Sequence, residues 1–340
     1  MASKSNSIVG IGTGSNRRQN VRMALENTGT DFAGIIKDEV ILKPNFLSGT
    51  NPVVCTHPDA IRGILDVIVD LPQKPKRILI AEGGNENVSG EAFKHMGYID
   101  IPFEYDIPIE LIDLNKETRW QNTRVYMVDG SWTVVRMPRT ILDCPCVISV
   151  GVAKTHDGGM VTLALKNLIM GTILKRDRIK VHGFKNHHDR KHPQEAQALN
   201  RNLIRLARHI YPHYSVVDGT VGIQGNGPGG TDTIPLELAA AGKDTIAVDA
   251  IISKAMGFEP LEVGTIFYGD MIGLGVGRLE KINLIGGDLA KLAIPFKCPE
   301  SIQLQRKWAI EGSGRKRLWD NKDRDINIIN FNFNGSVWLL

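Results

Sequence analysis

The stretch AKTHDGGMVTLALKNLIMG, residues 153–171, combines residue types that suit chemistry on an anion. Lys154 and His156 stand two apart, so they face the same side if the apolar strand before them continues. Gly158 and Gly159 follow. We expect these glycines to let the backbone approach a ligand and to begin a helix whose free amides attract anions. The stretch therefore predicts an anion pocket.

Lys166 and Asn167 are expected about two turns into the apolar helix VTLALKNLIMG. An unpaired ammonium among leucine side chains costs several kcal/mol. A negatively charged ligand or a buried acidic partner removes that cost. Asp249, in the apolar segment DTIAVDAII, is expected either to pair with a lysine such as Lys166 or to cap a backbone. A lysine that extends to solvent at one helix edge is the alternative.

Polar residues follow other apolar runs of strand character, and ligands of α/β proteins lie beyond the carboxyl ends of such strands. They are Lys43 and Asn45 after EVIL, Glu82 after RILIA, and Asp218 after YSVV. If the strands are parallel, these residues converge on one rim of the sheet. We expect them to share a ligand with Lys154 and His156.

The segment THPD before IRGILDVIV is typical of a helix start. Thr56 is the expected N-cap, Pro58 lies in the first turn, and Asp59 completes a capping box. The capping box does not require a histidine at position 57. At a helix N-terminus the dipole would lower the pKa of His57, which could then serve as a neutral donor or acceptor to a ligand.

Two loops carry weaker signals. The segment IQGNGPGGTD, residues 223–232, has neither the Walker order nor the dinucleotide fingerprint, so a binding loop, a lid and a surface turn all remain open. His187, His188 and His192 lie among basic residues without a cysteine, so we predict no metal site there.

Apolar strand segments alternate with helical segments along the chain, which indicates an α/β fold with a mostly parallel sheet flanked by helices. The segment RVYMVDGSWTVVRM has the pattern of an antiparallel hairpin, which we expect as an insertion on the sheet's edge. We predict an N-terminal half (1–145), a C-terminal half (146–297) that carries the main motif, and a tail (298–340). The apolar end of that tail, NIINFNFNGSVWLL, is expected as an edge strand or against a partner.

The overall charge argues against nucleic-acid binding. The chain of 340 residues has 41 Lys and Arg against 37 Asp and Glu, a formal net charge of +4, without the dense basic face of nucleic-acid proteins. No apolar run reaches the length of a membrane span, and the first residues lack a signal-peptide core. We therefore expect a cytoplasmic protein that contacts neither membrane nor nucleic acid.

In combination, several segments make the chain resemble the family named Domain of Unknown Function 362 (DUF362). They are LKPNFLS, THPDAIRGILD, AKTHDGGMVTLALKNLIMG, His182 after a basic loop, VVDGTVGIQGNGPGG and AGKDTIAVDAIISKAMG. The resemblance implies an α/β fold and a shared polar site onto which Lys43, Asn45, His57, Lys154, His156, Lys166, Asn167, His182, Asp218 and Asp249 map. Many members also carry ferredoxin-type cysteine clusters, which this chain lacks.

We predict an enzyme that acts on a small anionic or phosphorylated substrate by proton transfer of the isomerase or lyase type. Lys154 and Lys166 would hold the negative charge, and His156, assisted by Asp218 or Asp249, would move protons. His57 is a further catalytic candidate. The substrate-binding candidates are Lys43, Asn45, Glu82, Gly158, Gly159, Lys166, Asn167, His182 and Asp249.

Two alternatives stay open. One is an oxidoreductase, a reductase that receives electrons from a separate ferredoxin or flavoprotein. The other is a non-catalytic protein that binds a nucleotide or cofactor. The sequence indicates neither a particular cofactor nor a set of metal ligands.

Overall fold

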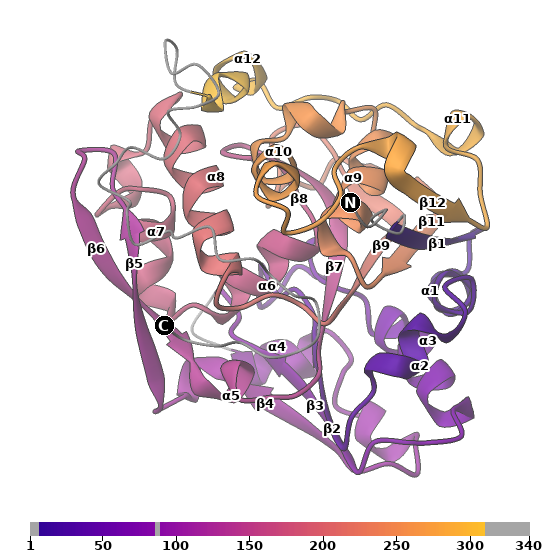
Figure 1. Ribbon diagram of the computed structural model, residues 1–340. Helices are drawn as coiled ribbons and strands as arrows, with labels where there is room; N and C mark the ends of the chain where they lie inside the picture. Colours follow the sequence, from indigo (N-terminus) through magenta and orange to yellow (C-terminus); the bar gives the residue numbers. More distant parts are fainter. Residues whose placement is uncertain (1–6, 86–88, 310–340) are drawn as a thin grey trace, which may run out of the picture. The chain divides into compact units, whose positions relative to one another are not determined.

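A ten-stranded sheet is the framework of the protein in the computed structural model, which describes residues 7–85 and 89–309 (Figure 1). The strands along the sheet are β12 (Ile282–Ile285), β1 (Ser7–Thr13), β11 (Leu238–Gly242), β9 (Tyr214–Ile223), β7 (Val147–His156), β2 (Glu39–Lys43), β3 (Arg77–Glu82) and β4 (Ile109–Asp113). Two short strands extend it, β8 (Met160–Thr162) beside β7 and β10 (Thr233–Ile234) beside β9.

The sheet is mostly parallel, as the alternation of segments predicted. β9, β7, β2, β3 and β4 pair in parallel, and β1 pairs in parallel with β12. β11 is the antiparallel member between β1 and β9. Every residue of β7 is buried, as expected for a central strand covered on both faces.

Helices cover both faces of the sheet. Those described are α1 (Arg17–Glu26), α2 (Thr30–Ile35), α3 (Pro58–Asp70), α4 (Ser89–His95), α5 (Arg139–Leu142), α6 (Ala164–Thr172), α7 (Arg178–Val181), α8 (Gln194–Ala207), α9 (Thr245–Ala255), α10 (Gly264–Met271), α11 (Leu289–Leu292) and α12 (Ile302–Gln305). α1 and α3 lie beside each other (Figure 1) and share a hydrophobic core with Val40, Leu42 and Ile148. Ser149, the next residue of β7, points to the opposite face and donates its hydroxyl to Ala164 O of α6 at 2.7 Å.

The predicted hairpin is present, but its expected place on the sheet's edge is wrong. β5 (Trp120–Tyr126) and β6 (Trp132–Pro138) form a separate two-stranded antiparallel sheet. The hairpin is held by α8, because Asn202 accepts from Tyr126 N and donates to Tyr126 O, both at 2.7 Å. Arg201 lies over the ring of Tyr126 at 4.4 Å. Periodicity does not encode these side-chain contacts, which join the hairpin to α8.

Strands from both predicted halves join in one sheet, because β1 lies between β11 and β12. The boundary near residue 145 stays a prediction. By its internal contacts the chain divides into Met1–Trp308 and Ala309–Leu340. The predicted edge strand in NIINFNFNGSVWLL lies outside the described residues.

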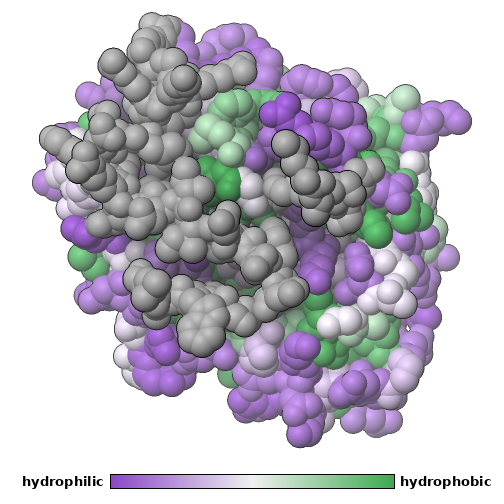
Figure 2. All heavy atoms as spheres, in the orientation of Figure 1, coloured by the Kyte–Doolittle hydropathy of each residue, from purple (hydrophilic) through white to green (hydrophobic). Residues whose placement is uncertain are grey.

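Two features concern the surface and the helix lengths. Hydrophilic residues predominate on the part of the visible face that is described, with small apolar patches between them (Figure 2). Within residues 7–85 and 89–309, no helix is long and apolar enough to cross a membrane.

Candidate functional site

A cavity of about 590 Å³ lies beyond the carboxyl ends of β2, β3 and β7. The predicted site residues that line it are Asn45, Glu82, Lys154, His156, Lys166, Asn167 and His182. Of these, Asn45, Glu82, Lys154 and His156 were expected at one rim because they follow apolar strands. Other candidates are not among the lining residues, namely Lys43, His57, Gly158, Gly159, Asp218 and Asp249.

Lys154 is a buried cation near the end of β7. Its Nζ donates to Val54 O at 2.8 Å and to Asn45 Oδ1. Both acceptors are neutral, so neither balances its charge. Burial lowers the pKa of Lys154 to about 8. Asn45 and the carbonyl of Val54 thus fix the position of the Lys154 ammonium.

Lys166 lies in the first turn of α6, not two turns in, because the helix begins at Ala164. Its side chain is 8% exposed, so it does not extend to solvent. Among the described residues it has no hydrogen-bond or ion-pair partner. Burial lowers the pKa of Lys166 to about 7, and the charge of Lys154 contributes, while Asp157 opposes the shift.

Asp249, the acidic residue expected as a possible partner of Lys166, contacts the backbone of α6 instead. Its carboxylate accepts from Ala164 N at 2.9 Å and from Leu165 N at 3.2 Å, so it caps the start of α6. Of the two expected roles, backbone capping is the one observed. Burial raises the pKa of Asp249 to about 7, and the two amides oppose that shift.

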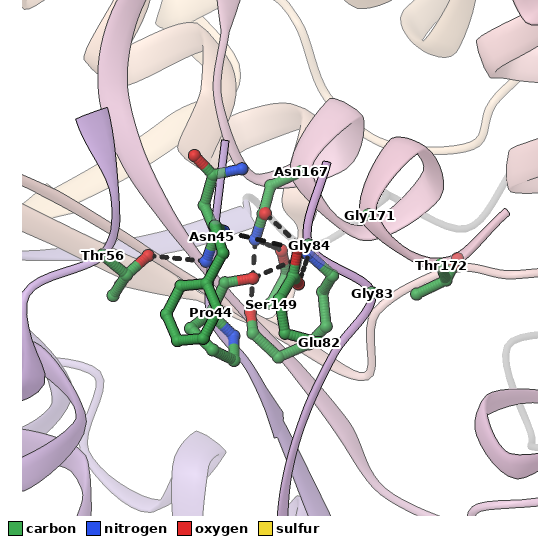
Figure 3. A network of polar contacts seen from close by, with 12 residues as sticks. Pro44, Asn45, Thr56, Glu82, Gly83, Gly84, Ser149, Asn167, Gly171 and Thr172 are labelled. Carbon is green, nitrogen blue, oxygen red and sulfur yellow. Dashed lines mark hydrogen bonds and ion pairs between the residues drawn. The ribbon is translucent and has the colours of Figure 1, made fainter. Parts of the chain in front are cut away.

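Lys43 belongs to a polar network that includes Glu82, Ser149 and Asn167, which lie close together in Figure 3. It is fully buried and pairs with Glu82, whose other oxygen, Oε1, accepts from Phe46 N at 3.3 Å. Lys43 Nζ also donates to Asn167 Oδ1 at 2.9 Å. Asn167 Nδ2 in turn donates to Ser149 Oγ at 3.0 Å and to Lys43 O at 3.2 Å. This lysine is charge-balanced within the protein.

His156, at the end of β7, is buried, and its own hairpin turn fixes its ring. Its Nδ1 accepts from Gly158 N at 2.7 Å and from Gly159 N at 3.1 Å. The two glycines therefore do not begin a helix; they form the turn between β7 and β8, and their amides hold the histidine instead of an anion. Burial, followed by the nearby charge of Lys166, holds the pKa of His156 well below its usual value.

His182 is paired with a carboxylate that the sequence analysis did not select. Its Nδ1 lies 2.7 Å from Glu195 Oε1, on α8. Arg190 also donates its Nε to that oxygen, at 2.8 Å. Burial alone would raise the pKa of Glu195, but the hydrogen bonds and charges of His182 and Arg190 lower it to about 2. The rings of His182 and His156 stack with centroids 6.0 Å apart.

Gly158 is required beside this pair for a steric reason. A Cβ atom at Gly158 would lie 2.6 Å from Glu195 Oε1 and 3.2 Å from Cε1 of His156. Any side chain there would push the carboxylate and the ring apart. Gly158 thus allows the turn between β7 and β8 to lie close to α8 beside both histidines.

His57 and Asp218 have other partners. His57, not Thr56, is the N-cap of α3, and its Nδ1 accepts from Asp59 N at 3.1 Å. Thr56 instead donates to Val150 O at 2.8 Å, which links the loop to β7. Burial, then the charge of Arg17, lowers the pKa of His57, a different cause from the expected helix dipole. Asp218 pairs with Arg17 at 2.5 Å.

The glycine-rich segment 223–232 contributes backbone to the cavity. Pro228 and Gly229 are among the lining residues. Gly227 O accepts from Asp157 N at 2.9 Å, and Gly225 O accepts from the Thr155 hydroxyl at 2.9 Å. These bonds tie the segment to the end of β7.

Sequence reasoning missed several charged residues around the cavity. Those at its wall are Asp157, Lys175, Arg178, His187 and Arg190, and Glu195 lies behind His182. A signal for Glu195 exists, because it stands four residues before Leu199 on the buried face of α8. Arg178 is held by Gly83 O and by Ile173 O, contacts that no local pattern indicates.

Comparisons with known proteins place the chain in a family. Thylakoid-associated protein sll1697 of Synechocystis sp. is 25% identical over 248 residues, which cover 72% of this chain and 70% of that protein. The lactate racemase apoprotein of Thermoanaerobacterium thermosaccharolyticum superposes with a TM-score of 0.47 at 16% identity, over 69% of this chain and 54% of the racemase chain. The model of the family described as a domain of unknown function, DUF362, matches residues 40–254. The chain therefore belongs to the DUF362 family.

Proposed function

We propose that this protein is an enzyme that binds a small anionic or phosphorylated substrate in the cavity and acts on it by lysine and histidine acid–base chemistry. The observation that carries the proposal is Lys166. Its ammonium is buried at the cavity wall and has no acidic partner among the described residues. A substrate anion beside it would supply the missing charge.

The charges around Lys166 support an anion as the ligand. The lining cations are Lys154, Lys166, Lys175, Arg178 and Arg190, against the carboxylates Glu82 and Asp157. Glu82 is already paired with Lys43, and Asp157 accepts from Arg190 at 3.2 Å. The positive charge of Lys154 and Lys166 is therefore left for the ligand, in a site where low dielectric strengthens the attraction.

The histidines support proton transfer as the chemistry. His156 and His182 line the same cavity as the two lysines. An ammonium next to a substrate carboxylate stabilises an enolate as it develops, and an imidazole can move the proton. Asp218 and Asp249, the expected helpers of His156, are engaged with Arg17 and with the start of α6. Glu195 Oε1 lies 2.7 Å from Nδ1 of His182, and Asp157 Oδ1 lies 3.3 Å from Nδ1 of His156.

Anion binding by the full chain tests the proposal. Isothermal titration with inorganic phosphate and with pyruvate at pH 7 is expected to show saturable binding of at least one probe. Lys166→Met should weaken that binding at least tenfold. Lys76→Met is the matched control, because Lys76 is an exposed surface lysine paired with Asp38, and its affinity should equal that of the parent. Equal affinities in all three proteins would contradict the proposal.

The two alternatives predict different results. A reductase served by a separate ferredoxin or flavoprotein would show a bound flavin or iron–sulfur chromophore, or would oxidise a reduced ferredoxin when substrate is added. A non-catalytic binding protein would bind the anion without turning it over. Absorbance spectra of the purified protein and product analysis after dialysis separate these cases from the proposed enzyme.

The cytoplasmic location is likewise a prediction. The name of the Synechocystis relative associates that protein with thylakoids. Cell fractionation with an antibody against the full chain would distinguish a cytoplasmic protein from one that associates with membranes.

A further inference from the structure

Two of the three histidines that line the cavity, His156 and His182, are held in opposite chemical roles. Glu195 is buried on α8, and its Oε1 accepts from Arg190 at 2.8 Å. With its pKa at about 2 it is a carboxylate anion near neutral pH, which can only accept hydrogen bonds. The nitrogen 2.7 Å away, His182 Nδ1, must therefore carry a proton. In the neutral ring, Nε2 of His182 then has a free lone pair.

His156 has the reverse arrangement. The amides of Gly158 and Gly159 both donate to its Nδ1. That nitrogen holds the lone pair, so the single ring proton of neutral His156 is on Nε2. Burial, followed by the charges of Lys166, Arg190 and Lys154, disfavours an imidazolium. Asp157 Oδ1 lies 3.3 Å from the same Nδ1, but that carboxylate accepts from Arg190 at 3.2 Å. His156 can donate a hydrogen bond from Nε2, but it cannot accept a second proton without losing the bonds from its turn.

We propose that His182, positioned by Glu195, is the catalytic base of this cavity, and that His156 is a neutral hydrogen-bond donor to the substrate oxygen on which negative charge develops. This inference rests on the proposed function and names its substrate class, a small carboxylate with an acidic C–H bond next to a carbonyl group, such as a 2-oxo acid.

The proton transfer balances within the cavity. The C–H bond next to the carbonyl breaks, and its electron pair forms the carbon–carbon double bond of an enolate. The proton passes to His182 Nε2, and the imidazolium so formed is stabilised by Glu195 at 2.7 Å. The enolate oxygen accepts from Nε2–H of His156, and Lys166 faces the substrate carboxylate. Return of the proton to carbon regenerates neutral His182.

Fixed tautomers can be measured without a substrate. In full-length protein labelled with ¹⁵N, long-range ¹H–¹⁵N spectra at pH 7.5 should show the Nδ1–H form for His182 and the Nε2–H form for His156. The single variants His182→Asn and His156→Asn assign the signals. Diethyl pyrocarbonate, which attacks an unprotonated ring nitrogen, should modify His182 at least tenfold faster than His156. The opposite tautomers, or equal modification, would overturn the assignment of roles.

Exchange of pyruvate methyl protons in D₂O, followed by ¹H NMR, tests the chemistry. The full chain should accelerate exchange, and His182→Asn should reduce the acceleration about 100-fold or more. Glu195→Gln should slow exchange and shift its pH profile. His182 would then be surrounded by Arg190, Lys166 and His156, with no carboxylate to stabilise its imidazolium form. Glu195→Asp should restore part of the rate, which a purely structural role would not predict.

The outcomes separate this inference from the proposed function. If phosphate or pyruvate binds and both histidines have the expected tautomers, but no proton exchange occurs, the enolisable substrate class is overturned. Anion binding would still stand in that case. Exchange that persists in His182→Asn would overturn the choice of base. Failure of every anion to bind would contradict the proposed function itself.

Discussion

Two buried lysines of this protein, Lys43 and Lys166, differ in what faces them. Lys43 pairs with Glu82 and is bonded to Asn167. Lys166, one residue before Asn167 on α6, has no such partner among the described residues, although its side chain is also buried. Burial therefore does not distinguish a charge-balanced lysine from an unbalanced one. The presence of a matching carboxylate does, because an unpaired buried charge persists only where something else repays its desolvation.

Removal of the paired lysine should give the largest effect. Lys43→Met leaves the Glu82 carboxylate buried without its partner, so we expect a loss of about 3 to 5 kcal/mol in the free energy of unfolding, measured by urea denaturation. The double variant Lys43→Met/Glu82→Gln is the control and should recover much of that loss. An unchanged stability of Lys43→Met would remove the basis of the comparison.

Removal of the unpaired lysine should have the opposite sign. Lys166→Met should raise stability by about 1 to 4 kcal/mol at pH 6, because a buried charge is replaced by an apolar side chain of similar length. The folded-state pKa is lowered from 10.5 to about 7. The cost of charging Lys166 is therefore complete below pH 7 and fades as the pH rises towards 10.5.

Urea denaturation of the parent and Lys166→Met at pH 6 and pH 10 checks this sign. The gain should be clear at pH 6 and small at pH 10. A loss of stability at pH 6 would mean that Lys166 has a structural partner after all, and it would then resemble Lys43.

Substitution of Asp249 sharpens the comparison further. Asp249→Ala removes the acceptor for Ala164 N and Leu165 N, so we expect a loss of about 0.5 to 2 kcal/mol at pH 6, the range of a helix cap. Asp249→Asn keeps an acceptor and should lose less. Thermal denaturation of the parent and both variants measures these losses of stability. A loss as large as that of Lys43→Met would instead indicate an ion pair with Lys166.

The smallest effect is expected at His57, which caps α3 and is not at the cavity wall. His57→Ala should cost about 1 kcal/mol or less, as loss of a half-exposed cap, and His57→Asn should restore it. The affinity for phosphate or pyruvate should not change in either variant. Weaker anion binding in His57→Ala would return this histidine to the site.

Local patterns predicted most of the framework and the core of the site. The apolar runs before Lys43, Glu82 and Lys154 are strands, and the helix expected after THPD is present as α3. The rule that parallel strands end at one rim predicted a common place for Lys154, His156 and Glu82, which line one cavity, but it also included Lys43 and Asp218, which are not among the lining residues. These predictions succeeded because they depend on periodicity and chain direction, which the sequence carries residue by residue.

Predictions of which polar groups contact each other were less accurate. Gly158 and Gly159 were expected to offer amides to an anion, yet a turn of three residues brings those amides to His156. Glu195 was not selected, although it is a charge on the apolar face of its helix. Its partner, His182, lies outside the helix, and only the packing of α7 and of the turn at Gly158 against α8 brings the carboxylate beside the histidines.

By itself, the sequence determined the order of strands and helices and the placement of lysines and histidines at strand ends, because side-chain periodicity and local turn chemistry act over a few residues. Only the tertiary structure decided which charges meet. Lys43 is balanced by Glu82 because β2 and β3 pair in parallel. Lys166 is left unbalanced because Asp249 turns to the helix amides. Coulombic and hydrogen-bond energies depend on separations of a few ångströms, and those separations are set by how the elements pack.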